Sequence, residues 1–599
     1  MNVKKKYLLA GLTMMTAATL LVACGGSSKK GQDKKPADNV DITALPVKSS
    51  NQEKAIDGQT MEVAVVMDTQ FKGLFLWELY DDNYDAQFMA PSHGSLFTSD
   101  EDFVITNDGV ASLDLDIKGK KATIKIQEDL KWSDGQTVTA EDLIYPYEII
   151  GNKDYTGVRY DSNFTNIVGM EDYHSGKADT ISGIKKVDDK TIEISYQEMN
   201  PSMQQLGGGI WSYAAPKHAL ESTPIKDLEK SDAVRRTPVT FGPYKMSKIV
   251  AGESVTFTPN EFYYKGKPSL DKLVFTVVPT ASSIEAMRAS KYDMMIKMAT
   301  DTYPNYKDTE NYEVLGREEL SYTYIGFKLG KWDGEKNEVV TDENAKMADK
   351  SLRQAMGYAL NNDQVGEKFY NGLRSNATTL IPPVFGTLHD TTIKGYTEDK
   401  EKAKTLLADA GFKDVDGDGF VEDKDGKPLV IKFASMDGGE TAQPLADYYV
   451  QSWKEIGLNV ELSTGRLIDF QSFYDKLKND DKEIDVFQAA WGTGNDPTPS
   501  GLYGRTAQFN YTRFASEEND KLLAAIDSNA SFDPEKRKEA FDAWQQYASE
   551  EAFVIPTLYR NEVLPVNARV TGVDWSSNVL PQDLWYNIGV TAESRPNNK

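Results

Sequence analysis

Hydrophobic residues along this 599-residue chain occur in short runs separated by polar turns. Runs of four to eight residues that are continuous, or that alternate with polar residues, predict β-strands. We expect strands at Met61–Val66, Ala122–Gln127, Thr191–Tyr196, Ser254–Thr258, Lys272–Val278, Leu429–Ala434, Leu458–Leu462 and Ile484–Ala489. Stripes with helical spacing stand between these runs, and such an alternation favours α/β lobes.

Three helices are indicated by apolar spacing combined with signals at their ends. One stripe covers residues 403–410 and another covers Leu445–Ile456, and a glycine follows each where a helix end favours a positive φ. The third helix begins at Asp533, a capping residue, with Pro534 in its first turn. It is expected to bury Phe541, Trp544 and Ala548.

The N-terminal segment has the pattern of an export signal that ends at Cys24, the only cysteine. Lys4–Lys6 precede an apolar run over residues 7–22, which is short for a membrane-spanning helix, and the small residue Ala23 follows. Because a cysteine comes next, the segment resembles a bacterial lipobox. We expect residues 1–23 to be removed and Cys24 to be diacylated, which anchors a protein stably to a membrane. The alternative is an ordinary secretory signal with an incidental cysteine.

The rest of the chain fits an exported protein. No later stretch approaches 18 apolar residues, so we expect no other membrane span. With Cys24 acylated, no thiol remains for a disulfide, a metal ligand or a nucleophile. Residues 24–56 are polar and predict a flexible tether.

The net charge of −25, or −28 without the three leader lysines, argues against binding to nucleic acid or to anionic lipid surfaces. Abundant aromatic residues (9 Trp, 30 Tyr and 24 Phe) suit a large core and also a partly apolar cleft.

The most specific internal segment is Lys131–Asp142. Its Ser-Asp-Gly sequence predicts a turn after a strand, and Thr139 with Asp142 predicts a capping box at a helix start. This segment resembles the signature of the solute-binding lipoproteins that serve peptide ABC importers, the oligopeptide- and dipeptide-binding family. Five further segments resemble this family in the family's order: Ile184–Ile194, Phe241–Lys245, Asn260–Pro268, Arg353–Leu360 and Ala403–Gly411.

The resemblance implies an α/β, two-lobed periplasmic-binding-protein-like fold with a hinge and an extra small domain on lobe I. Lobe I is expected at residues 57–90, 216–326 and 561–599, the extra domain at 91–215, and lobe II at 327–560. Two crossings between the lobes would form the hinge, and ligand would bind in the cleft between them.

The resemblance also implies a function. We expect a lipid-anchored, monomeric extracytoplasmic receptor that binds oligopeptides between its lobes and delivers them to the permease subunits of an ABC transporter. A Gram-positive surface is favoured by the lipobox and the charged tether. The alternatives are the same scaffold binding a glycan or a metal chelate, or a surface adhesin or signalling receptor.

A candidate ligand site follows the predicted strand Ile484–Ala489, because ligand contacts collect at strand ends in α/β clefts. In the family, an aspartate in a Trp-Gly…Asp-Pro loop accepts the α-ammonium of the bound peptide, and the resemblance assigns this role to Asp496. A second aspartate that the family often carries is replaced here by Thr493 or Gly494. The alternative is an Asn-Asp-Pro turn without a ligand.

The backbone of Trp491, Gly492 and Thr493 is the candidate for pairing with an extended peptide, since glycine allows close approach. Further candidates for the cleft lining are Tyr503, Phe509, Asn510 and Tyr511. For the aromatic residues among them, packing in the core is the alternative. No residue is indicated for the peptide C-terminus.

Residues 414–425 have the spacing of an EF-hand calcium loop, although position 12 is Asp instead of Glu and no exit helix is predicted. The candidate ligands are Asp414, Asp416, Asp418, Phe420, Glu422 and Asp425. The alternative is an acidic surface turn. Apart from this structural calcium ion, the sequence indicates no cofactor.

An enzyme is not indicated. The four histidines, His93, His174, His218 and His389, show no metal-ligand spacing, and the chain has no nucleophile elbow and no phosphate-binding loop.

Overall fold

A computed structural model of the protein describes residues 40–127 and 129–596. Cys24, the predicted leader and residues 24–39 of the predicted tether lie outside the described residues, so the lipid anchor stays a prediction. Within the described ranges, no helix combines the length and the apolar character needed to cross a membrane.

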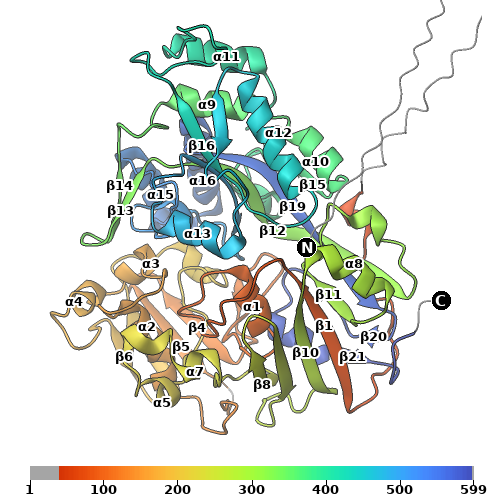
Figure 1. The fold of residues 1–599 in the computed structure, drawn as a ribbon. Helices are drawn as coiled ribbons and strands as arrows, with labels where there is room; N and C mark the ends of the chain where they lie inside the picture. Colours follow the sequence, from red (N-terminus) through yellow and green to blue (C-terminus); the bar gives the residue numbers. More distant parts are fainter. Residues whose placement is uncertain (1–39, 128, 597–599) are drawn as a thin grey trace, which may run out of the picture. The chain divides into compact units, whose positions relative to one another are not determined.

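Within these residues, an eleven-stranded mixed sheet runs through the fold (Figure 1). In order across the sheet, its strands are β17 (Asn459–Leu462), β16 (Val430–Ala434), β18 (Val486–Gly492), β12 (Tyr312–Phe327), β19 (Val554–Asn567), β11 (Met294–Ile296), β1 (Gln59–Val66), β10 (Leu270–Val278), β9 (Ser254–Pro259) and β8 (Tyr244–Val250), with β15 (Arg374–Asn376) paired to β19. β1 is parallel to β10 and β11, and β16 is parallel to β17 and β18. Each end of the sheet therefore has the α/β character that the sequence pattern predicts.

The long strands β12 and β19 connect the two lobes. Their antiparallel pairing covers Tyr312–Glu318 and Tyr322–Gly326 of β12, with a register shift between Glu318 and Tyr322. Val314 and Leu315, before the shift, pack in the cores of lobe I, whereas Tyr322 and the residues after it pack in the core of lobe II. The chain therefore passes from the cores of lobe I to the core of lobe II at the register shift.

Helices pack around the sheet of lobe II and form its core with β12, β16, β18 and β19. They are α9 (Lys350–Tyr358), α10 (Asn362–Tyr370), α11 (Lys400–Asp409), α12 (Ala442–Lys454), α13 (Phe470–Lys478), α14 (Ser500–Tyr503), α15 (Glu517–Ile526) and α16 (Pro534–Glu551). The helix ends follow the sequence signals: Gly411 after α11 has φ +97°, and the Asp533 side chain accepts backbone N–H bonds at the start of α16. α16 buries Phe541, Trp544 and Ala548, as its apolar spacing predicts.

The core of lobe I packs around β1, β8, β9 and β10. Its remaining elements are α1 (Asn83–Met89), α8 (Thr280–Arg288), α17 (Pro581–Asn587), β20 (Val570–Thr571), β21 (Gly589–Val590) and the 3₁₀ turns Ile42–Ala44 and Tyr303–Asn305.

The extra domain has its own core and a four-stranded antiparallel sheet in the order β4-β5-β7-β6. Its strands are β2 (Thr98–Ser99), β3 (Ile105–Thr106), β4 (Ala111–Asp116), β5 (Lys121–Ile126), β6 (Ile184–Lys186) and β7 (Thr191–Ser195). The helical elements here and after it are α2 (Ala140–Gly151), α3 (Ser162–Thr165), α4 (Met170–His174), the 3₁₀ turn Pro201–Gln204, α5 (Lys217–Leu220), α6 (Ile225–Leu228) and α7 (Asp232–Arg235). The predicted capping box starts α2, where Asp142 Oδ2 accepts the Thr139 N–H at 2.9 Å.

Residues 40–56 differ from the predicted tether, because they lie against the body. The backbone N–H of Gly316 in β12 donates to Pro46 at 3.0 Å, and Trp575 N donates to Val47 at 2.8 Å. Ile42 and Leu45 pack on a core of lobe I. The prediction of a tether as far as residue 56 is wrong for this part, since few apolar residues suffice when the body supplies the partners.

The polar stretch near 331–343 forms regular structure. It contains a hairpin of β13 (Gly330–Asp333) and β14 (Glu338–Thr341). Val339 is fully buried in it, so one apolar position fixes a segment that composition alone marks as a loop.

Candidate functional site

A cavity of about 780 Å³ lies between the lobes. Its wall includes residues from 77–87 in lobe I, 202–213 in the extra domain, 490–503 in lobe II and 317–322 in β12. Interdomain hydrogen bonds join the surrounding parts, among them Gln471 Nε2 of lobe II to Asp82 Oδ2 of lobe I at 3.2 Å. The lobes thus enclose a volume within the range of ligand-binding pockets.

One corner of this cavity is acidic and contains Asp496. The hydroxyl of Ser202, from the extra domain, donates to Asp496 Oδ2, while Thr498 donates its N–H at 3.1 Å and its hydroxyl at 2.7 Å to Oδ1. Arg537 Nη2 lies 3.8 Å from Oδ1. The predicted site residue therefore lines the cavity, and its carboxylate is held in a fixed position by both domains.

Two more carboxylates lie near this corner. Burial is the main cause that raises the pKa of Asp527 to about 7, and the charges of Asp496 and Asp161 act in the same direction. Burial likewise raises the pKa of Asp161, the N-cap of α3, to about 6. The environment therefore disfavours additional negative charge and favours a cation placed among these groups.

Gly208, the middle one of the three glycines at 207–209, lies against Asp496. A Cβ at Gly208 would lie 2.2 Å from Ser202 O and 2.8 Å from Asp496 Oδ2. Because a side chain would collide with both groups, the extra domain approaches Asp496 only with glycine at this position.

The predicted cleft backbone lies at the end of β18. β18 pairs with β12 along its length, up to Gly492 opposite Ser321, but it pairs with β16 only at Val486 and Phe487. In the described residues, the other edge of Gln488–Gly492 has no ladder partner, although Tyr474 OH donates to Ala490 O. Trp491, Gly492 and Thr493 line the cavity, so an unpaired strand edge faces the ligand space.

The other predicted lining residues are divided between cavity and core. Tyr511 and Phe509 line the cavity and contact the ring of Trp491, each with ring centroids 5.3 Å apart. Tyr503 borders the cavity, but its side chain is 2% exposed and its hydroxyl bonds that of Tyr322. Asn510 is 1% exposed and is not among the lining residues, because its amide donates to the backbone carbonyls of Tyr503, Gly504 and Phe514. The expectation that Asn510 lines the cleft is therefore wrong.

A second aromatic group on the opposite wall was not anticipated from the sequence. Trp77 and Tyr213 stack with centroids 4.3 Å apart, Tyr80 contacts Trp77, and Trp211 contacts Tyr213. All four line the cavity. Sequence signals were lacking because lobe I supplies Trp77 and Tyr80, whereas the extra domain supplies the other two.

Charged residues of the hinge strands form another part of the wall. Glu319, in the register shift, accepts from Lys297 Nζ at 2.9 Å and lies 3.0 Å from Arg560 Nε. Glu562 lies 2.6 Å from Arg317 Nη2 and 3.3 Å from Lys297. Burial alone would raise the pKa of Glu319, but Arg560 and Lys297 hold it well below its usual value. The hinge thus contains a largely buried ionic network.

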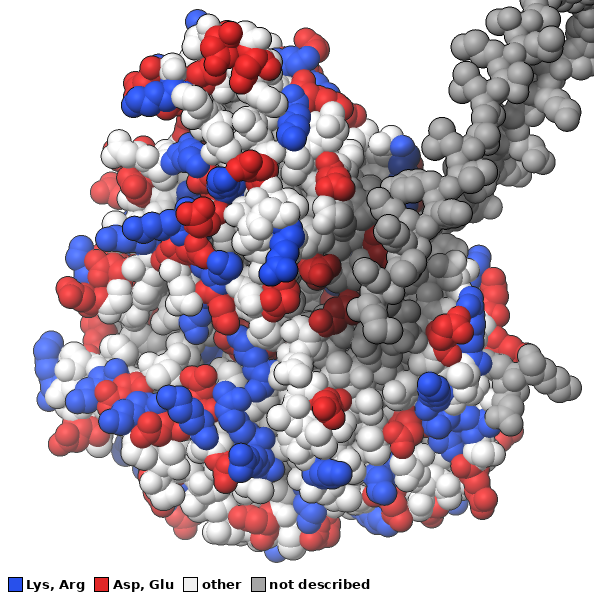
Figure 2. Space-filling model, viewed as in Figure 1, with Lys and Arg blue, Asp and Glu red and all other residues white. Residues whose placement is uncertain are grey.

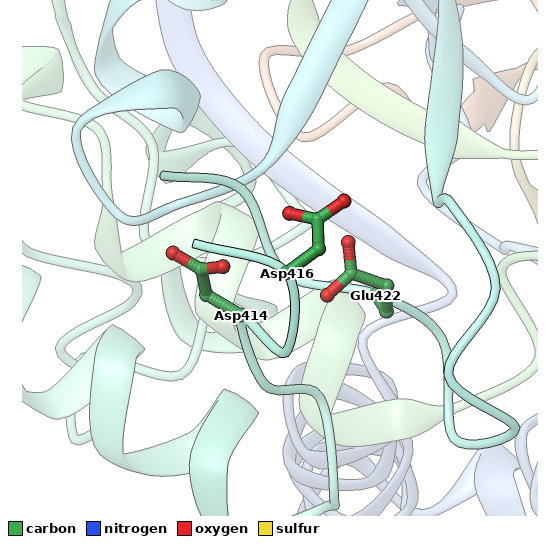
Figure 3. A group of neighbouring side chains, drawn as sticks. All are labelled: Asp414, Asp416 and Glu422. Carbon is green, nitrogen blue, oxygen red and sulfur yellow. The ribbon is translucent and has the colours of Figure 1, made fainter. Parts of the chain in front are cut away.

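The predicted calcium loop brings together only part of its candidate ligands. Carboxylate oxygens of Asp414, Asp416 and Glu422 lie within 4.8 Å of one another (Figure 3). Asp418 and Asp425 are not in this group; Asp418 Oδ1 accepts the N–H of Phe420 instead. The EF-hand assignment of position 12 to Asp425 is therefore not supported by the geometry. Calcium binding by the remaining three residues stays a prediction.

Charges of both signs are mixed on the face shown in Figure 2. Figure 2 shows Lys and Arg intermingled with Asp and Glu over the viewed face, and many of them form ion pairs, such as Lys400 with Glu398 and Glu455. On this face, the acidic residues are thus interspersed with basic ones.

Comparisons with known proteins agree with this architecture. Residues 106–512 match the profile of bacterial extracellular solute-binding proteins, family 5 Middle. The oligopeptide-binding protein OppA of Lactococcus lactis subsp. cremoris (strain SK11) is 37% identical over 603 residues, with 99% of each chain covered.

Solved structures extend the comparison. Lactococcal OppA complexed with an endogenous peptide in the closed conformation has a TM-score of 0.86 and 36% identity, covering 89% of this chain and 100% of that chain. AppA from Bacillus subtilis in complex with a nonapeptide has a TM-score of 0.75 and 21% identity, covering 90% and 100%. The expected two-lobed α/β fold is confirmed.

Proposed function

The chain belongs to the bacterial extracellular solute-binding proteins of family 5, and we propose that it is a receptor that binds oligopeptides between its lobes and delivers them to an ABC transporter permease. Members of this family are extracytoplasmic solute-binding receptors rather than enzymes. The whole-chain similarity to an oligopeptide-binding protein supports peptides as the ligand class.

The observation that carries the proposal is the unpaired edge of β18 beside the acidic corner of the cavity. An extended peptide can add to such an edge through its main chain, which does not depend on side-chain identity. Asp496 would accept the α-ammonium of the peptide, and a cation taken from water needs an opposite charge of this kind. The two aromatic groups provide apolar surface for side chains.

Transport follows from differential binding. A peptide that contacts both lobes stabilises the closed form, and the permease would recognise that form. Micromolar affinity, about −8 kcal/mol, is enough for such a receptor. We propose further that the protein acts as a monomer without catalytic activity, anchored through lipid on Cys24, and that Asp414, Asp416 and Glu422 hold a structural calcium ion.

Mass spectrometry of the untagged, full-length protein tests the function. The protein is purified, denatured, and the released compounds are identified, with the Asp496→Asn variant treated in parallel. A mixture of short peptides from the wild type, reduced in the variant, supports the proposal. A glycan or a metal chelate without peptide contradicts it and favours the alternative solutes. If nothing is released, titration with a random peptide pool decides, and absence of binding contradicts the proposal.

A further inference from the structure

The cationic side chains of the cavity differ in how they are neutralised. Among the described residues, the Lys and Arg side chains that line the cavity are Arg159, Lys297, Arg317 and Arg560. The last three lie within ion-pair distance of Glu319 or Glu562. No described carboxylate lies within that distance of Arg159. Arg159 is thus a cationic group of the cavity wall that has no ion-pair partner among the described residues, although its charge lowers the pKa of Glu78 and Asp161.

Arg159 is held in place by uncharged groups. Its Nη2 donates to Tyr80 O at 2.8 Å, and its backbone N–H donates to Tyr155 OH at 3.4 Å. Its Cζ lies 4.1 Å from the centre of the Tyr80 ring and 5.8 Å from that of Trp211. These contacts fix the plane of the guanidinium without neutralising it.

Hydrogen-bond donors remain unused at this wall. The Nε of Arg159 is buried and has no acceptor, and the same is true of Nε1 of Trp77. Trp77 also lines the cavity, and its ring contacts that of Tyr80, with centroids 5.1 Å apart. A guanidinium has five N–H donors, and a buried donor without an acceptor is costly. The wall therefore favours a group that offers acceptors and negative charge.

The nearest acidic groups do not fill this role. Glu78 is fully buried, and its Oε1 accepts from Trp211 Nε1 at 3.0 Å. Burial raises the pKa of Glu78 to about 7. Asp161 uses Oδ1 to accept the N–H of Asn163 at the start of α3. Both side chains lie beyond ion-pair distance from Arg159, so a carboxylate entering the cavity would be its closest anion.

We infer that Arg159 forms a carboxylate-binding subsite, with Trp77 as a neighbouring donor, for a carboxylate of the bound peptide. This inference rests on the proposed peptide binding. The carboxylate is either the peptide C-terminus or an Asp or Glu side chain. The planar fork of Arg suits either source, because it can donate two parallel hydrogen bonds to a carboxylate.

The subsite would favour one orientation of the bound peptide in the cavity. Asp496 attracts an ammonium at one place in the wall, and Arg159 attracts a carboxylate at another. If the C-terminus is the source, both ends of a bound peptide are recognised, and peptide length is restricted by the distance between the two groups. If a side chain is the source, the C-terminus stays unrestricted and acidic peptides are preferred.

The test uses pools of synthetic octapeptides with free N-termini that are randomised without Asp or Glu. This pool is made in two forms, with a free C-terminal carboxylate and with a C-terminal amide. Two further pools of C-terminal amides carry Glu in one case and Gln in the other, at each position in turn. Apparent affinities are measured by calorimetry with the full-length wild type, Arg159→Met and Arg159→Lys. Arg317→Met is the matched control: it removes the same charge from the cavity, while Glu562 keeps Lys297 as its partner.

For a C-terminal source, the wild type should bind free acids about tenfold more tightly than amides, as expected for a hydrogen-bonded charge pair. Arg159→Met should abolish this preference, and Arg317→Met should retain it. For a side-chain source, the Glu pool should exceed the Gln pool by a similar factor, with the same dependence on Arg159.

Arg159→Lys keeps the charge but not the fork, and should reduce the preference by about threefold or more. If Arg159→Met fails to fold, the result with Arg159→Lys decides whether Arg159 forms the subsite. Equal binding of all pools by the wild type would overturn the subsite while leaving peptide binding intact, and so would a carboxylate preference that survives in Arg159→Met. No binding of any pool would instead reject the proposed function, and the inference with it.

Discussion

The hydroxyl of Ser202, in the extra domain, donates a hydrogen bond to the carboxylate of Asp496, in lobe II. These residues are 294 positions apart in the sequence. The adjacent turn adds a second bridge, since Arg537 Nη2 donates to Gln205 Oε1 at 2.7 Å. The acidic corner is thus formed only when lobe II and the extra domain meet, which links occupation of the cavity to closure.

Replacing Asp496 by Asn should weaken binding of free-amine peptides by about tenfold or more, because the ammonium loses its counter-charge. Calorimetry with a random octapeptide pool measures this. N-acetylated peptides should bind the wild type and the variant equally. Glu318→Gln is the control, because Glu318 is an exposed carboxylate of the same cavity. Unchanged affinity in Asp496→Asn would reject the assignment.

Replacing Glu319 by Gln should lower the free energy of unfolding by about 3 kcal/mol, because Lys297 and Arg560 would keep buried charges without a full partner. Urea denaturation at pH 7 measures the change. The neighbouring Glu318→Gln should change stability by about 0.5 kcal/mol at most, since that side chain is exposed. Equal stability of the two variants would show that the hinge network is not stabilising.

Glu78 should make the protein less stable as the pH rises. Its pKa is raised by burial from 4.5 to about 7 in the folded chain. Below pH 4.5, the carboxyl group is protonated in both the folded and the unfolded state. Between pH 4.5 and about pH 7, it ionises in the unfolded state but stays protonated in the folded state, so the free energy of unfolding falls until about pH 7. Each pKa unit corresponds to about 1.4 kcal/mol, so the loss is about 3 kcal/mol.

Urea denaturation of Glu78→Gln at pH 5 and pH 8 tests this. The amide keeps an acceptor for Trp211 but cannot ionise. The difference in free energy of unfolding between the variant and the wild type should therefore shift in favour of the variant between pH 5 and pH 8. The exposed Glu343→Gln should follow the wild type at both pH values. A parallel pH dependence in Glu78→Gln would contradict the raised pKa.

Calcium should raise the melting temperature by about 2 °C or more, because an ion that binds only the folded state stabilises it. Scanning calorimetry with excess calcium and with a chelator measures the effect. Asp416→Asn should abolish the effect, whereas Asp425→Asn should respond like the wild type, because of these two residues only Asp416 belongs to the group of three carboxylates. An effect that depends on Asp425 would favour the EF-hand spacing over the observed geometry.

Local features could be predicted from the sequence because their causes lie within a few residues. Thr139 and Asp142 start α2 as a capping box, and Gly411 adopts the positive φ that ends α11. Hydrophobic spacing likewise located α16 and its buried face. Motifs that resemble a known family added the two-lobed fold, which spacing alone does not give.

Other features depended on contacts between distant segments. Residues 40–56 have a tether's composition, but they pack on lobe I because β12 and the segment near Trp575 supply their partners. Asn510 was expected in the cleft, yet its amide closes its own turn. Arg159 gave no signal in the sequence, since its exposure to the cavity and its lack of a carboxylate partner are properties of the assembled wall.

By itself, the sequence determined the predicted export signal, the α/β elements and the position of the Asp496 loop, because capping, periodicity and motif order are local. The tertiary structure alone decided which groups meet Asp496, which strand edge faces the cavity and which described cation of the wall has no ion-pair partner. These depend on three domains that converge on one cavity, and such convergence is set by long-range packing, which no local pattern records.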